Sequence, residues 1–505
     1  MAPAHRSTAV ERAQYVRQMF AHRGEYGFVT GLSRAVGVSR QTLYTWAARG
    51  EQALLAAFAP AAVEAAPAPL ARQILTLYVE THASYRGVQR ALREVTGRAV
   101  SLAAIGAVVT AAMAQARHWL ATHQPATARA VALDELYGNN RHGAYLHVVD
   151  VGSGAVWWAE GPLPVDGETW ALVLWEAEAR GLRWAEAVTD GAGGMAQACA
   201  IVAPQVAVQR DVWHVLQRCA QVQGRLDREV AAQQARQAAV ERQAARVAAG
   251  AAPLGRNPQT DAQARAAEVA LARRAAADVR FLTQELRRLL EVVVLDARGL
   301  LTLAQRQAEL EATLALLAEV AAAAPAAGQR EVQRLHKHLT QALPGLLVFA
   351  ARLARVERDW QAVLPPAQQA LLAWAWQRRA ALGVASAALS TWLPEAYRQA
   401  AQVLLHAWDT AVRVSSAVER WHSLLRPHLA VHRTLSSGLL ALLAVWHNHR
   451  VFPRGDHQGQ SPLHLSGLAE APTDWLTALG YPPGAPAPPP LLRQHATSAR
   501  TAVAA

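Results

Sequence analysis

Three acidic residues stand out by their position along the chain. Asp134 follows the largely apolar run ARAVAL, Asp190 ends a short apolar segment just before a glycine-rich turn, and Glu419 lies in the segment SAVERWHSLLR. Carboxylates at the ends of neighbouring strands, with a third from a helix, form a hard oxygen site that suits two Mg²⁺ ions, with Mn²⁺ as the alternative ion. Such metals activate a water or a 3′-hydroxyl for in-line attack on a phosphodiester. The three acids therefore predict phosphodiester chemistry, provided that the fold brings them together.

Each acid also has a simpler interpretation. An aspartate at a strand end is more often a turn residue or a helix cap, and a glutamate on a helix is usually solvated. Asp211 is the second choice for the position given to Asp190, and Glu357 and Glu395 lie on helical segments that precede Glu419. Asp190 is preferred because an Asp-Gly pair after a short apolar strand suits a central sheet position. Glu419 is preferred because it is the one acid between residues 414 and 450.

Basic residues gather around Glu419. Arg420, Arg426 and Arg433 follow it in a stretch without a second acid. A surface so poor in acids would hold DNA phosphates close to the metals. We expect all three arginines to contact DNA.

The N-terminal segment 1–55 is expected to form helices joined by short turns. Within FVTGLSRAVGVSRQTLYTWAARG, apolar residues share one helical face, Gly37 permits a tight turn, and Ser39 can cap a second helix. This order is typical of a helix-turn-helix, whose second helix enters the major groove of DNA. An ordinary helical hairpin has a similar pattern. The residues expected to contact DNA are Ser39, Arg40, Gln41, Thr42 and Tyr44.

A stretch rich in alanine and proline, 56–71, is expected to be a linker. A similar pattern of helix, glycine and serine cap then recurs at 72–125, around Gly97 and Ser101. This predicts a second unit like a helix-turn-helix. A bundle that serves only packing is an equally good interpretation, because the last helix is very apolar.

From residue 129 the pattern changes to three strands, a helix, a strand, a helix and a strand. Three antiparallel strands that continue into strand–helix alternation predict an α/β fold with a five-stranded mixed sheet and flanking helices. The expected core occupies 129–214 and 414–467, interrupted by a helical insertion at 215–413. The proline-rich end, 468–505, is expected to be disordered.

Composition narrows the class of protein. The chain has 505 residues, with 50 basic residues against 38 acidic ones, for a net charge of +12. An excess of arginine favours nucleic acid as a partner, although a GC-rich genome also produces it. Two cysteines exclude a disulfide scaffold, and we expect neither a signal peptide nor a membrane span. These features predict a soluble, intracellular protein.

The segments LDELYG, VTDGAGGM, VAVQRDVWHVLQ, SSAVERWHSLLR and LLALLAVWHNHRVFPRG, in this order, resemble the DDE transposases of bacterial insertion sequences. The likeness is greatest to those with a helical insertion before the last acid, and it covers about 129–214 and 414–467. The resemblance implies an RNase H-like core with Asp134, Asp190 and Glu419 as the catalytic, metal-binding triad. It also implies double-stranded DNA as the partner, namely terminal inverted repeats and target DNA, held by a homodimer or a higher synaptic oligomer. A location in the bacterial cytoplasm, associated with the nucleoid, is implied as well.

The resemblance also implies a role for His214. Families of this layout often carry Cys or Asp, two residues, then His after the second catalytic Asp, and Asp211-Val212-Trp213-His214 fits. His214 is then expected to contact DNA or to position the active site, while a half-buried structural histidine fits equally well. A zinc site of Cys199, His214 and Cys219 matches no familiar zinc-finger spacing. A non-catalytic DNA-binding protein derived from such an element, and a structure-selective nuclease of the same fold, are the alternative functions.

Overall fold

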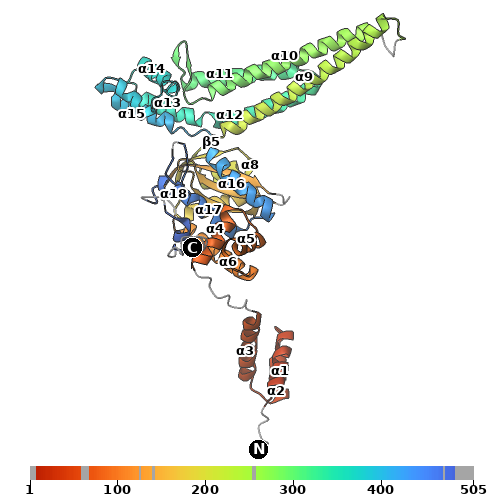
Figure 1. Ribbon diagram of the computed structural model, residues 1–505, viewed down its shortest axis with the longest axis vertical. Helices are drawn as coiled ribbons and strands as arrows, with labels where there is room; N and C mark the ends of the chain where they lie inside the picture. Colours follow the sequence, from red (N-terminus) through yellow and green to blue (C-terminus); the bar gives the residue numbers. More distant parts are fainter. Residues whose placement is uncertain are drawn as a thin grey trace, which may run out of the picture. The chain divides into compact units, whose positions relative to one another are not determined.

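The computed structural model describes residues 7–58, 68–123, 127–138, 143–252, 258–455, 457–469 and 473–483 (Figure 1). By its internal contacts the chain divides into two compact units, Met1–Ala66 and Pro67–Ala505. The predicted linker, 56–71, falls largely on residues 59–67, which lie outside the described ones. Each unit is considered by itself.

The first unit contains three described helices. They are α1 (Ala9–Ala21), α2 (Phe28–Val36) and α3 (Arg40–Phe58). Gly37 ends α2 in the left-handed conformation, with φ +65°. Residues with a side chain rarely adopt this conformation, whereas glycine adopts it readily. Ser39 Oγ accepts a hydrogen bond from Thr42 N at 3.1 Å and so caps α3, while Leu43 is buried beneath it. The glycine turn and the serine cap therefore lie where the sequence predicts them.

The second unit contains the sheet. Its strands are β1 (Ala128–Tyr137), β2 (Ala144–Asp150), β3 (Val156–Leu163), β4 (Trp184–Thr189) and β5 (Ala207–Arg210). Their order is β3-β2-β1-β4-β5; β1, β2 and β3 are antiparallel, whereas β4 and β5 run parallel to β1. Helices α7 (Gly167–Ala179) and α8 (Gly193–Val202) lie in the two connections that lead to β4 and β5. The predicted α/β class and five-stranded mixed sheet are confirmed.

The late helices of this unit pack against the sheet, and the early helices pack against the late ones. The early ones are α4 (Ala68–Glu80), α5 (Tyr85–Thr96) and α6 (Leu102–Thr122). The late ones are α16 (Ser416–His432), α17 (Ser437–His449), α18 (Pro462–Leu465) and α19 (Trp475–Ala478). Helix α6 packs on α17, and α17 packs on β3. Trp446 Nε1 of α17 donates to Glu80 Oε1 of α4 at 2.6 Å, so α4–α6 belong to the same compact unit as the sheet.

The helical insertion follows β5 without a break, because α9 begins at Val212. Its elements are α9 (Val212–Ala248), α10 (Pro258–Leu289), β6 (Leu295–Asp296), β7 (Gly299–Leu300), α11 (Leu303–Ala323), α12 (Ala326–Leu346), α13 (Val348–Trp360), α14 (Pro366–Gln377), the 3₁₀ helix η1 (Ser386–Trp392) and α15 (Glu395–Asp409). Helices α9 and α10 form a long antiparallel hairpin (Figure 1). The short β6–β7 hairpin was not predicted from the sequence.

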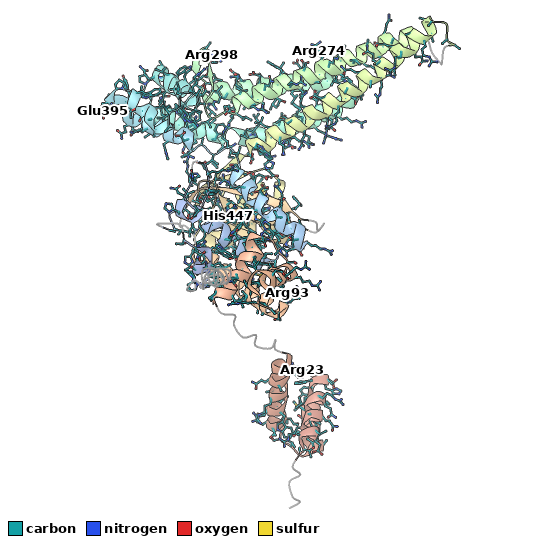
Figure 2. All side chains as sticks on the ribbon, in the orientation of Figure 1. Arg23, Arg93, Arg274, Arg298, Glu395 and His447 are labelled. Atoms are coloured by element: carbon teal, nitrogen blue, oxygen red, sulfur yellow. The ribbon has the colours of Figure 1, made fainter. Side chains whose placement is uncertain are left out.

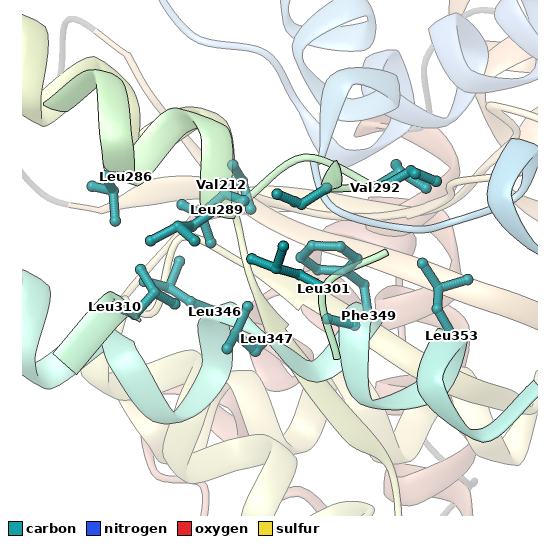
Figure 3. Close-up of a cluster of buried hydrophobic side chains, with 14 of the residues drawn as sticks. Val212, Leu286, Leu289, Val292, Leu301, Leu310, Leu346, Leu347, Phe349 and Leu353 are labelled. Carbon is teal, nitrogen blue, oxygen red and sulfur yellow. The ribbon is translucent and has the colours of Figure 1, made fainter. Parts of the chain in front are cut away.

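The insertion has its own hydrophobic core. Figure 3 shows Leu286, Leu310, Leu346 and Phe349 from four of its helices turned toward one another. One stretch of the described residues, Gly328–Trp360, is long and apolar enough to cross a membrane by length and composition alone. Its apolar side chains Leu346 and Phe349 belong to this core, which gives the stretch a packing role in the fold.

The end of the chain differs from its prediction. Residues 468–505 were expected to be disordered, but the described part includes α19, whose Trp475 and Leu476 are buried. Arg72 of α4 binds Asp474 Oδ2 at 2.6 Å and thereby holds the start of α19. Two apolar side chains and an ion pair outweigh the disorder-promoting composition nearby. The stretch PPGAPAPPP lies almost wholly outside the described residues.

Candidate metal centre

The strand register brings three acids into one row across the sheet. Asp134 lies within β1, because that strand continues to Tyr137; it does not end at Asp134 as expected. Leu133 pairs with Thr189 of β4, so the following residues, Asp134 and Asp190, are neighbours. Thr189 in turn pairs with Arg210 of β5, which places Asp211 next in the row. Parallel neighbouring strands thus align acids that are far apart in the sequence.

Helix α16 lies over this row and supplies two further groups. It packs against both β1 and β2. Glu419 and His422 are three residues apart on α16 and therefore share a face. Ligand atoms of Asp134, Glu419 and His422 all lie within 4.8 Å of one another, close enough to hold one metal ion. This group is the candidate metal centre.

Burial and like charge act together on Asp134. Its side chain is 6% exposed; Oδ1 accepts a hydrogen bond from Glu135 N at 2.8 Å, and Oδ2 has no hydrogen-bond partner in the part of the chain that the structure describes. Burial, followed by the charges of Asp190, Glu419 and Asp211, raises the Asp134 pKa to about 8. A bound cation would offset this repulsion and would satisfy the unpartnered oxygen. The residues present therefore fit a divalent metal.

His422 belongs to the centre, although sequence reasoning missed it. The side chain is 2% exposed, and Nδ1 lies 3.9 Å from Asp134 Oδ2, too far for a hydrogen bond. Nε2 has no partner among the described residues. Burial, with smaller contributions from Arg426 and His214, lowers the His422 pKa to about 3, so the ring is neutral and able to bind a metal. Its three-residue spacing from Glu419 was the available signal.

The environments of Asp190 and Asp211 separate their roles. Asp211 Oδ1 accepts from Trp213 N at 2.6 Å and caps α9, while Oδ2 accepts from Ser415 N at 2.8 Å and from the Ser415 hydroxyl. Both oxygens of Asp211 are therefore engaged in holding α9 and the start of α16. Asp190 is half-buried, and its Oδ1 accepts from Ala192 N at 2.8 Å. Asp190 is the better placed of the two to bind a metal.

The arginines expected near Glu419 take different positions. Arg426 Nη2 lies 3.3 Å from Glu419 Oε2, an exposed ion pair of small energetic value. Arg420 places its guanidinium over the Phe452 ring, 5.3 Å from the centroid. Arg433 ends α16 with φ +57° and is exposed. All three lie on α16 or at its end.

His214 lies beside the centre, whereas the alternative zinc site does not form. His214 is half-buried at the start of α9, and its proximity lowers the pKa of His422. Its Nε2 has no hydrogen-bond partner among the residues described. Cys199 and Cys219 are buried, and burial raises their thiol pKa values to about 11 and about 12. Neither cysteine joins His214 in a metal-type group within the described ranges.

The N-terminal residues expected to read DNA lie at the start of α3. Ser39, Arg40, Gln41 and Tyr44 are exposed, and Thr42 is half-buried. The Ser39 hydroxyl also lies 2.8 Å from Thr42 Oγ1, so both hydroxyls contribute to the cap. Comparison of the chain with protein-family models and with curated proteins gives no match.

Proposed function

We propose that this protein is a DDE transposase with an RNase H-like core, which cuts the ends of a mobile element and joins its 3′-hydroxyl to target DNA. The observation that carries the proposal is the grouping of Asp134 and Glu419, from β1 and a distant helix, with Asp190 next to Asp134 by the strand register. The predicted resemblance to bacterial insertion-sequence transposases supports the same residues.

Bound Mg²⁺ or Mn²⁺ would supply Lewis-acid activation of the attacking water or 3′-hydroxyl. Asp134, Asp190 and Glu419 would hold the ions, with His422 as an additional ligand. Arg426, which is exposed, is placed to exchange its ion-pair partner, Glu419, for a DNA phosphate. The low exposure of Asp134 and His422 keeps bulk water away from these ligands.

The N-terminal unit has the order of elements needed to recognise the terminal inverted repeats. In a helix-turn-helix, the N-terminal end of the second helix reads base edges in the major groove. Arg40, Gln41 and Tyr44 are exposed at that end of α3. Strand transfer needs both ends of the element held together, so we expect a dimer or a larger synaptic assembly.

The test is incubation of the purified protein with labelled candidate terminal repeats and a target plasmid, in Mg²⁺ and in Mn²⁺. Joined products are the expected result. Cutting without joining would assign a nuclease, and binding without cutting would assign a non-catalytic DNA-binding protein.

Single substitutions at the three acids test the site. Loss of a residue that only supports a metal ligand costs roughly 10- to 100-fold in activity. Asp134→Asn, Asp190→Asn and Glu419→Gln should each reduce cutting and joining by more than this, because each removes a ligand itself. Circular dichroism of each variant checks that the fold is kept. Full joining activity in Asp134→Asn or Asp190→Asn would show that the proposed site is wrong.

A further inference from the structure

A pocket of about 560 Å³ lies between α16, the end of α17 and the loop that follows α17. Arg420, Arg450 and Arg454 line it, together with Phe452 and His457. All three arginines are exposed, and in the described part of the chain no acidic residue forms an ion pair with them. The name arginine pocket is used for this group of five residues.

The wall of the arginine pocket is held in place by local contacts. The loop closes on itself, because Phe452 N donates to Gln460 O at 2.8 Å and Gly459 N donates to Phe452 O at 3.0 Å. Two guanidinium groups lie over aromatic rings: Arg420 over Phe452 and Arg450 over Trp446, both at 5.3 Å. A guanidinium stacked on a ring keeps its in-plane N–H donors available to a ligand. The arginines are thus positioned before any ligand arrives.

Charge and geometry define the kind of ligand. The planar fork of arginine matches the oxygens of a phosphate group, and several arginines without acidic partners among the described residues favour a polyanion. Arg420 follows Glu419 directly in the sequence, so α16 carries one wall of the pocket and one ligand of the candidate metal centre. A strand that occupies the centre would therefore have its neighbouring phosphates near these arginines.

We infer that the arginine pocket binds backbone phosphates of the DNA strand that enters the candidate metal centre. The inference rests on the proposed function, since it takes DNA as the substrate. It assigns Arg450 and Arg454 a role that the sequence did not suggest.

The test measures binding of a short fluorescent DNA duplex to the full-length protein in EDTA, where no cutting occurs, over a range of salt concentrations. Arg454→Gln and Arg450→Gln should each weaken binding on the order of three- to tenfold and reduce the slope of log affinity against log salt by about 1. Arg330→Gln, at an exposed position of α12 outside the pocket, is the matched control. Arg454 has no aromatic contact, so its variant is expected to keep the fold even if Arg450→Gln does not.

A second series replaces single DNA phosphates by uncharged methylphosphonates. Replacement of the phosphate at one or two positions should weaken binding to the wild type. The same replacement should not weaken binding to Arg454→Gln any further, because this variant already lacks the contact. Salt slopes equal to that of Arg330→Gln, with metal-dependent cutting by the wild type intact, would overturn the arginine pocket alone. Failure of the wild type to bind any DNA would overturn the pocket and the proposed function together.

Discussion

At the scale of single residues, the candidate metal centre joins groups of different chemistry. Asp134 and Glu419 offer oxygen, while His422 offers a neutral nitrogen. Imidazole suits transition metals better than it suits Mg²⁺, which prefers oxygen ligands. A site made of two carboxylates and this histidine therefore favours Mn²⁺ over Mg²⁺ more strongly than a site of three carboxylates would.

Replacing His422 tests this preference. His422→Phe should lower Mn²⁺ affinity about 10- to 100-fold, with a smaller change for Mg²⁺, because the nitrogen ligand is lost. Isothermal titration calorimetry of the metal-free protein measures both affinities. His118→Gln, at an exposed position of α6, serves as the control. Equal losses for the two ions would mean that His422 acts only through packing.

At the scale of elements, the site depends on how strand ends connect to the helices that follow. Asp211 ties the start of α9 to Ser415, just before α16 begins. This contact fixes the point at which the chain leaves the sheet for the insertion and the point at which it returns. The position of Glu419 on α16 follows from it.

Replacement of aspartate by asparagine should therefore have opposite effects on stability and metal affinity at Asp211 and Asp190. Asp211→Asn replaces an acceptor that faces Ser415 N and should lower the free energy of unfolding by about 1–3 kcal/mol, with metal affinity nearly kept. Asp190→Asn should keep stability and lose metal affinity. Urea unfolding and metal titration of both variants make the comparison. The reverse pattern would restore Asp211 as the metal ligand.

The turn after β4 makes a further prediction. Gly191 has φ +79°, and a Cβ there would lie 0.8 Å from Arg210 Nη1. Gly191→Ala should cost about 1–2 kcal/mol of stability from the backbone alone and should displace Arg210, so that cutting declines as Asp190 moves. Gly193→Ala, two residues on with nothing within 4 Å, is the control and should be neutral. Urea unfolding and the cutting assay read out the two effects; equal behaviour of the variants would contradict this account.

At the scale of the whole molecule, buried neutral histidines connect the early and late helices to the sheet. His447 of α17, labelled in Figure 2, has its Nε2 3.0 Å from Gly154 O, and His428 of α16 lies 2.9 Å from His82, which follows α4. Burial is the main cause that lowers the His447 pKa to about 4 and the His428 pKa to about 3. Burial disfavours the charged form of both rings, so both are neutral in the folded protein near pH 7.

These buried histidines should make the fold less stable in acid. Unfolded histidines take up protons below about pH 6.5, whereas the folded ones do not, so stability is full above pH 6.5 and is lost as the pH falls toward 3. At pH 5 the loss should reach about 2 kcal/mol per buried histidine. Urea unfolding at pH 7.5 and pH 5 measures it.

His428→Gln should flatten this dependence even if it lowers stability at both pH values. The groups that face His428 are His82 and His432, whose charges oppose its protonation. His118→Gln should leave the pH dependence unchanged, because that residue is exposed. An unchanged slope in His428→Gln would assign the acid sensitivity to other groups.

The amino-acid sequence by itself determined the order of strands and helices around the sheet, the glycine turn and serine cap before α3, and the choice of Asp134, Asp190 and Glu419 as candidates. These follow from local spacing, which depends on residues close together in the chain. Tertiary structure alone decided that His422 joins the carboxylates, that Asp211 is engaged by Ser415, and that residues around Trp475 pack as a helix. The physical reason is that those contacts join distant segments, and a side chain's partners and burial are set by packing that no local pattern records.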